Sequence, residues 1–128
     1  MTSKFDRPHH ALNKIFHEPS RLAILSALIA VHDGITFNEL KRECDLTDGN
    51  LSRHLRTLEE AQIIRIQKSF EGSKPRTRVF LTPKGRESFI EYLQALEEVL
   101  KKAAAAMVNS KTVSAKDIPL PILKLLEA

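Results

Sequence analysis

The stretch that decides the fold is Thr47-Asp48-Gly49-Asn50-Leu51-Ser52-Arg53-His54-Leu55-Arg56-Thr57-Leu58-Glu59-Glu60. Its leucines recur at the i, i+4 and i+7 spacing that places side chains on one helix face. They are Leu51, Leu55 and Leu58. The opposite face carries Arg53 and Arg56 beside the amide of Asn50 and the hydroxyl of Thr57, in place of the usual mixture of Glu and Lys. The stretch predicts a helix over residues 48–61 that is buried on one side and suits a DNA groove on the other.

A second, shorter helix is expected immediately upstream. Thr36-Phe37-Asn38-Glu39 has the Thr-x-x-Glu form of a capping box, in which the threonine side chain caps a helix start. This helix would cover residues 37–44, and only Asp45-Leu46-Thr47 would separate it from the next one. Two helices joined by so few residues are typical of a helix-turn-helix. Ile35 is expected to form a stub of strand before the pair.

Downstream of residue 61 the hydrophobic period changes from 3.6 to 2. Residues with β propensity alternate roughly with polar ones over residues 63–69 and again over residues 76–81. The intervening Phe70-Glu71-Gly72-Ser73-Lys74-Pro75 contains the glycine and proline of a loop. The pattern predicts a β-hairpin with basic strands and a basic tip.

Positive charge gathers around this helix and hairpin. The whole chain has a net charge of only +4, whereas residues 53–86 contain nine Lys or Arg against three acidic residues. That segment therefore carries +6 and leaves −2 for the rest of the chain. A uniformly solvated surface would spread its charges, so the concentration indicates a polyanionic partner.

Helices are also expected on both sides of this region. A short one is predicted over residues 8–16, after a loose arm, and another opens at Pro19 and ends at His32-Asp33-Gly34. Thr82 and Pro83 supply an N-cap and a first-turn proline for a helix that continues to about Val108. A polar linker and a short apolar tail follow.

The last long helix exceeds what one small domain can cover. Its roughly 26 residues span about 39 Å at 1.5 Å per residue, and its apolar residues follow alternating spacings of four and three, which is typical of a helix that packs on a partner helix. The predicted homodimer interface consists of Phe89, Leu93, Leu96, Leu100 and Met107. The alternative is a stripe that packs only on the core of its own chain.

Size and composition predict one domain of ordinary size. The chain has 128 residues, of which 42% are hydrophobic and 28% charged. The expected fold is mainly α with a small β-hairpin (α+β), with residues 1–86 forming the DNA-binding part and residues 87–128 the dimerisation helix and tail of the same domain. No apolar run reaches 18 residues and the first residues lack a hydrophobic signal segment, so we expect a cytoplasmic protein without a membrane partner. The single Cys44 cannot form an internal disulfide.

From about residue 19 to residue 98 the sequence resembles the winged-helix transcriptional regulators of bacteria and archaea, of the broad ArsR/MarR type. The matching segments are residues 19–25, residues 37–40, residues 46–55 and Pro75-Arg76-Thr77-Arg78 leading to residues 81–86. The likeness is nearest to a small family with the Thr-Asp-Gly-Asn-Leu-Ser signature of residues 47–52. It implies a homodimer that binds a pseudopalindromic operator and changes transcription, with the helix of residues 48–61 in the major groove and the hairpin as a wing on the backbone or minor groove. Of the two signs of regulation, we expect a repressor and not an activator.

Nine residues are predicted to contact double-stranded DNA. We expect Arg53 to place its forked guanidinium on a guanine and Asn50 to pair with an adenine, whereas Ser52 and Arg56 are expected on phosphates. The alternative is a solvated surface, with Arg56 paired to a neighbouring glutamate and the wing cations serving as a charged edge against strand aggregation. The full set is Thr47, Asn50, Ser52, Arg53, Arg56, Lys68, Lys74, Arg76 and Arg78.

The sequence offers no pattern for catalysis or for a cofactor. It lacks a Gly-rich phosphate loop, a nucleophile elbow and paired carboxylates, so we expect no enzyme. Metal sensors of the ArsR group use paired cysteines or His and Asp ligands, but this chain has one thiol and no histidine after His54, which we expect to be partly buried. The open alternatives are a winged helix that binds only proteins, which the cationic face argues against, and RNA binding, which calls for more exposed aromatic residues than Phe70. No effector ligand is specified.

Overall fold

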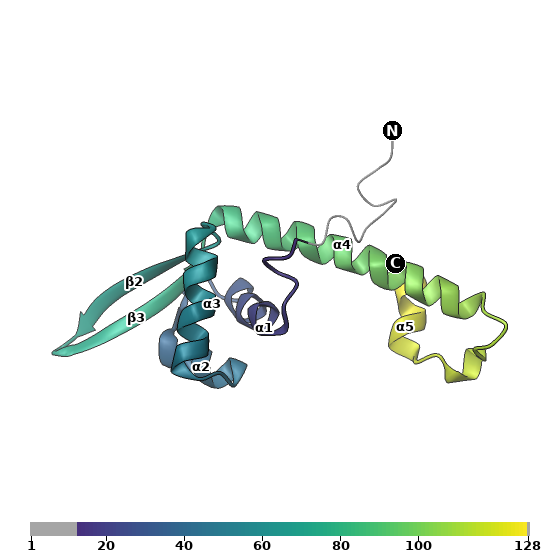
Figure 1. The fold of residues 1–128 in the computed structure, drawn as a ribbon, viewed down its shortest axis with the longest axis horizontal. Helices are drawn as coiled ribbons and strands as arrows, with labels where there is room; N and C mark the ends of the chain where they lie inside the picture. Colours follow the sequence, from purple (N-terminus) through teal and green to yellow (C-terminus); the bar gives the residue numbers. More distant parts are fainter. Residues whose placement is uncertain (1–12, 128) are drawn as a thin grey trace. The chain divides into compact units, whose positions relative to one another are not determined.

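The computed structural model describes residues 13–127. The elements follow the chain in the order α1 (Pro19–Ile29), β1 (Ile35–Thr36), α2 (Phe37–Cys44), α3 (Asp48–Glu60), β2 (Ile64–Glu71), β3 (Lys74–Leu81), α4 (Pro83–Val108), η2 (Ala115–Asp117), α5 (Leu120–Lys124) and η3 (Leu125–Glu127). The strands form one antiparallel sheet in the order β1-β3-β2. Three helices, a hairpin and a long last helix make a winged helix, so the predicted mainly helical fold with a small sheet is confirmed (Figure 1).

Side chains near the chain turns set where α2 and α3 begin and end. The hydroxyl of Thr36 accepts a hydrogen bond from the Glu39 amide at 3.2 Å, and that of Thr47 accepts one from the Asn50 amide at 3.1 Å. The cap at Thr36 is the one that the sequence predicted, and each of the two hydroxyls satisfies an amide with no partner inside the helix. Asp45 ends α2 in the left-handed conformation, with φ of 52°. The chain therefore passes from α2 to α3 within three residues.

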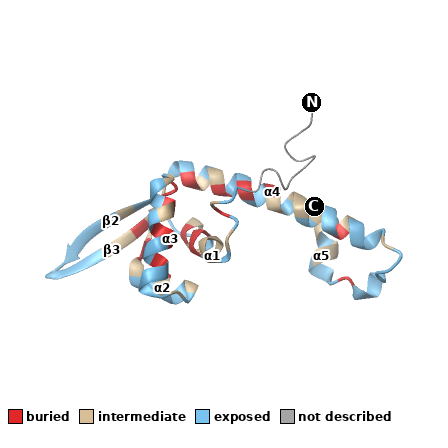
Figure 2. Cartoon of the chain, in the orientation of Figure 1, coloured by how far each residue is buried: buried red, intermediate tan, exposed pale blue. Residues whose placement is uncertain are grey.

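The chain divides into two compact units, one of residues 14–90 and one that includes residues 91–127. The core of the first unit joins α1, α2, α3 and the base of the hairpin, and Figure 2 shows buried positions on these elements and exposed ones toward the hairpin tip. Its fully buried apolar residues include Ile24, Leu25, Leu28, Leu40, Leu51, Leu58 and Val79. Burying one such side chain contributes about 1.5–3 kcal/mol, so the leucine stripe of α3 firmly fixes that helix on the core.

Two local predictions are wrong. Residues 14–16 form a turn and not the end of a helix, while the rest of the helix predicted over residues 8–16 lies outside the described residues except for residue 13.

The hairpin loop is also shorter than the predicted residues 70–75, because β2 continues to Glu71 and β3 begins at Lys74. Gly72, with φ of 64°, takes the first central position, as a two-residue type II′ turn requires. Pro75 is tolerated in β3 because β1 pairs with that strand only at residues 78 and 79.

Helix α4 contributes to both units. Phe89 is fully buried in the first unit, where its ring meets that of Phe16 edge to face at a centroid distance of 5.6 Å. The prediction that Phe89 lies at a dimer interface is therefore wrong, since its own chain already covers it. The other predicted interface residues lie further along, with Leu93, Leu100 and Met107 exposed and Leu96 half-buried. No helix within residues 13–127 has the length and apolarity needed to cross a bilayer.

Candidate nucleic-acid interface

Helix α3 separates a buried face from an exposed polar one, as the sequence predicted. Leu51, Leu55 and Leu58 are buried, whereas Asn50, Ser52, Arg53 and Arg56 are exposed. Neither arginine has an ion-pair partner among the described residues, so the alternative in which Arg56 pairs with a neighbouring glutamate finds no support. Both guanidinium groups are available to an external anion.

The first turn of α3 is open to solvent as well. Thr47 and Asn50 are exposed, and a Cβ added to Gly49 would meet no atom within 4 Å. Asp48 forms an ion pair of 2.7 Å with Lys41 of α2, which ties the two helices together. The free amides of this turn carry the positive end of the helix dipole, so the turn suits a phosphate.

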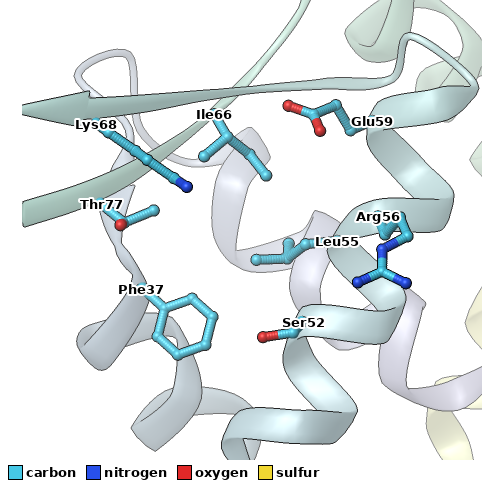
Figure 3. Close-up of a pocket in the computed structure, with 8 residues that line it drawn as sticks. All are labelled: Phe37, Ser52, Leu55, Arg56, Glu59, Ile66, Lys68 and Thr77. Carbon is cyan, nitrogen blue, oxygen red and sulfur yellow. The ribbon is translucent and has the colours of Figure 1, made fainter.

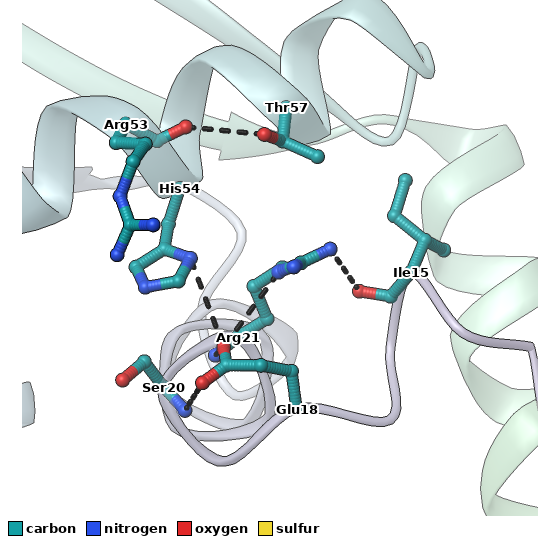
Figure 4. Close-up of polar contacts among 7 residues, drawn as sticks. All are labelled: Ile15, Glu18, Ser20, Arg21, Arg53, His54 and Thr57. Carbon is teal, nitrogen blue, oxygen red and sulfur yellow. Dashed lines mark hydrogen bonds and ion pairs between the residues drawn. The ribbon is translucent and has the colours of Figure 1, made fainter.

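A polar cluster under α3 was not predicted. The Nδ1 of His54, a residue only 7% exposed, lies 3.7 Å from the Glu18 carboxylate, as Figure 4 shows. The same carboxylate caps α1 by accepting hydrogen bonds from the amides of Ser20, at 3.1 Å, and Arg21, at 2.9 Å. The Arg21 side chain in turn donates to the Ile15 carbonyl at 3.2 Å. The cluster thus connects α3 to the start of α1.

Burial and charge shift the titration of this cluster. Burial lowers the pKa of His54; the Glu18 carboxylate opposes this, and the charges of Arg53 and Arg21 lower the pKa further. For Glu18, partial burial raises the pKa, but the amides of Arg21 and Ser20 together with nearby positive charge hold the pKa below its usual value. The arrangement favours an ionised Glu18 and a neutral His54.

The register of the hairpin sorts the wing side chains onto two faces, since directly paired residues share a face and successive residues alternate. The first face, which we call the inner face, carries Ile66 with Val79, Lys68 with Thr77, and Phe70 with Pro75. The outer face carries Arg65 with Phe80, Gln67 with Arg78, Ser69 with Arg76, and Glu71 with Lys74. Figure 3 shows that Ile66, Lys68 and Thr77 border the space beside α3, so the inner face is the one toward that helix.

The wing cations predicted to contact DNA differ in the hydrogen bonds and ion pairs that they form within the protein. Arg78 donates hydrogen bonds to the carbonyls of Asp33 at 3.1 Å and Gly34 at 3.3 Å, so its guanidinium anchors the turn before β1. Arg76 pairs with Glu71 at 3.1 Å. Arg78 is therefore held within its own chain through Nη1, whereas Arg76 shares its charge with a carboxylate. Lys68 and Lys74 are exposed and have no ion-pair partner within residues 13–127.

A cavity of about 370 Å³ lies between α3 and the wing (Figure 3). Its lining residues are Phe37, Ser52, Leu55, Arg56, Glu59, Ile66, Lys68 and Thr77. Ser52, Arg56 and Lys68 place a hydroxyl and two cations around it, against the one carboxylate of Glu59, above an apolar floor. The cations outnumber the carboxylate, so the arrangement can hold an anionic group between α3 and the wing.

The structure brings Ser52 and Arg56 of α3 together with Lys68 of β2, the next element along the chain. Sequence reasoning predicted all three, but it missed Phe37 and Thr77 as their neighbours, and it missed Glu18 as the partner of His54. Phe37 had no sequence signal beyond its place after a capping threonine. Glu18 had a weak one, because a side-chain acceptor directly before Pro19 can cap a helix that opens with proline.

A family model described as a winged helix DNA-binding domain matches residues 20–100. Among curated proteins, an uncharacterized protein of Methanocaldococcus jannaschii is 36% identical over 88 residues, which make up 69% of this chain and 95% of that relative. The match to the family model includes α3, the wing and much of α4.

Solved structures resemble the chain over similar lengths. A transcriptional regulator homologue of Pyrococcus horikoshii is 28% identical with a TM-score of 0.69, and the match covers 77% of this chain and 97% of that one. MepR of Staphylococcus aureus, solved in complex with DNA, is 20% identical with a TM-score of 0.61, covering 80% of this chain and 85% of MepR. The second likeness shows the shared fold.

Proposed function

This chain belongs to the winged helix DNA-binding domain family, and on that premise we propose that it is a sequence-specific, double-stranded-DNA-binding transcriptional regulator. The observation that carries the proposal is the exposed face of α3. Arg53 and Arg56 project from a helix whose opposite side is fixed in the core, and no acidic partner neutralises them within residues 13–127. A rigid helix that displays unpaired guanidinium groups matches the width and charge of a major groove.

The exposed residues of α3 divide by their expected partners. Arg53 and Asn50 read base edges, because a guanidinium fork matches guanine and an amide matches adenine. Thr47, Ser52 and Arg56, with the amides of the first turn, bind phosphates and set the register. Arg56 borders the cavity beside α3.

The wing holds the phosphate strand on the other side of that cavity. Lys68 on its inner face lines the cavity and Lys74 lies at its tip, so both are assigned to phosphates. Arg76 is also exposed and adds positive charge to the wing, although its ion pair with Glu71 partly neutralises that charge. The structure of MepR with DNA supports this use of the fold for DNA binding.

The regulator acts as a homodimeric repressor on a pseudopalindromic operator. The exposed apolar residues of α4 support an interface at Leu93, Leu100 and Met107, with half-buried Leu96 between them. A symmetric dimer would place two recognition helices about 34 Å apart, one DNA turn, which requires two half-sites in the operator. Repression follows if the operator overlaps a promoter.

The test is a selection of binding sites from a library of random-sequence duplexes. The wild-type protein is expected to enrich one pseudopalindromic sequence, which we call the selected duplex. Arg53→Ala should lose about 1–3 kcal/mol of binding to it and relax preference at one position of each half-site. Lys124→Ala, which removes one exposed positive charge from α5, is the control and should bind like the wild type.

Two results would contradict the proposal. A protein that enriches no sequence and binds no duplex at low salt is not a DNA-binding regulator. Equal loss on the selected duplex and on random DNA for Arg53→Ala would remove that residue from base readout, though not from the interface.

A further inference from the structure

The inner face of the wing ends in an apolar pair that the proposed contacts do not use. Phe70 is 74% exposed, more than any other large hydrophobic side chain among the described residues. It lies directly opposite Pro75 in the hairpin register. An aromatic ring left in water at this position forgoes the stabilisation that burial would give it. We propose that Phe70, backed by Pro75, is an apolar wedge that enters the DNA minor groove and unstacks a base step there.

The hairpin presents this pair in a defined position. Phe70 pairs with Pro75 within a ladder that continues to Glu71 and Lys74, and a two-residue turn closes it. Gly72 adopts the positive φ that this turn needs. A short turn leaves few alternative conformations, so little ordering entropy would oppose insertion.

Phe70 and Pro75 also lie on the face of the wing toward α3, and they lie far enough from α3 to reach the minor groove. Phe70 is two residues beyond Lys68 on the inner face, the face that borders α3. From Ile66 beside α3 to Phe70 the strand advances about 13 Å, at about 3.3 Å per residue. That length is close to the major-groove width of about 12 Å, so with α3 in the major groove the tip would reach past the bordering phosphates to the minor groove.

Charge around the wedge favours nucleic acid over an apolar protein surface. Lys68 and Lys74 lie near it along the two strands, and the one acidic neighbour, Glu71, is already paired with Arg76 at 3.1 Å. An apolar partner would have to strip water from these cations, whereas phosphates on both sides of a minor groove would bind them. Phenylalanine and proline are among the residues that DNA-bending proteins insert between base steps.

The wedge rests on the proposed function and adds a sequence preference to it. Unstacking is easiest at pyrimidine–purine steps such as TA and CA. The selected duplex should therefore carry such a step where the wing meets the minor groove, although no polar group of the wing reads it.

The test places 2-aminopurine, which brightens when it unstacks, at successive flanking positions of the selected duplex. Wild-type protein is expected to raise the fluorescence at one flanking step, and Phe70→Ser to abolish that rise and weaken binding about tenfold. Phe70→Leu keeps an apolar wedge and should retain much of the rise. Leu120→Ser, which changes another strongly exposed apolar residue in α5, is the matched control and should behave as the wild type.

The outcomes separate the wedge from the proposed function. If wild type binds the selected duplex and Phe70→Ser gives the same fluorescence and affinity, the wedge is overturned and the regulator stands. A change of oligomeric state in Phe70→Ser without any effect on DNA would assign the pair to a protein contact and also overturn the wedge. If wild type binds no duplex, both proposals fail. Thermal melts of Phe70→Ser should match the wild type, because so exposed a side chain adds little to the core.

Discussion

The cations of the wing are predicted to differ in what their removal does to DNA binding. Lys68→Ala should weaken binding and make it less sensitive to salt, because Lys68 is exposed, borders the cavity beside α3 and has no ion-pair partner among the described residues. Arg78→Ala should leave the salt dependence unchanged, because Arg78 donates both of its observed hydrogen bonds to the carbonyls of Asp33 and Gly34.

The expected magnitude follows from the number of free cations. Arg56, Lys68 and Lys74 are assigned to phosphates in each protomer, so a dimer neutralises six. At about 0.9 counterions released per phosphate, the slope of log K against log salt is about −5, which corresponds to roughly a thousandfold loss of affinity between 50 and 200 mM salt. Lys68→Ala removes one phosphate contact per protomer and should make the slope shallower by about 2.

The assay is fluorescence anisotropy of the selected duplex over a salt series, with each variant checked by thermal melting. Arg78→Ala should instead lower the melting temperature, because two hydrogen bonds to the turn before β1 are lost, each worth about 1 kcal/mol or more. An unchanged slope for Lys68→Ala, or an equally reduced slope for Arg78→Ala in a folded protein, would refute the division of the wing cations into free and anchored.

Three further predictions concern packing, titration and assembly. Gly85→Ala should destabilise the protein by about 3 kcal/mol in denaturant unfolding, because the added Cβ would overlap the backbone carbonyl of Ile63; Gly49→Ala, which meets no atom within 4 Å, is the control and should not destabilise. Burial lowers the pKa of His54 below 6.5, so the neutral imidazole's contribution to the free energy of unfolding should be complete above pH 6.5 and decline as the pH falls through the lowered pKa. Thermal melts over a pH series should show this decline in the wild type and lack it in His54→Gln, and identical pH profiles of the two proteins would contradict the prediction. Leu100→Glu should convert the proposed dimer to a monomer in sedimentation while leaving the melting of the winged helix intact, and a dimer that persists in this variant would remove this face of α4 from the interface.

Much of the fold could be predicted from local patterns. The capping threonines, the leucine stripe and the proline after Thr82 act within a few residues of themselves, so the bounds of α2, α3 and α4 were predicted closely. Likewise the exposed face of α3 follows from helical periodicity alone. The clustered charge of residues 53–86 needed no fold to suggest a polyanion.

Local patterns were insufficient where residues distant in sequence decide the contacts of a side chain. Phe89 has the spacing of an interface residue, but contact with Phe16, far away in sequence, makes it part of the core. Arg78 has the charge of a phosphate ligand, yet two carbonyls some 45 residues earlier hold its guanidinium. Periodicity and charge predict which environment suits a side chain, but they do not predict which residue, distant in sequence, contacts that side chain in the folded protein.

The amino-acid sequence by itself thus determined helices α1 to α4, the presence of a hairpin and the clustering of positive charge, because caps, hydrophobic period and charge act locally. Tertiary structure alone decided which cations stay free, how far the strands extend, and that Phe70 lies opposite Pro75 on the face toward α3. Strand register and the packing of α3 beside the wing settle these points, and both arise from contacts between segments that no local pattern connects.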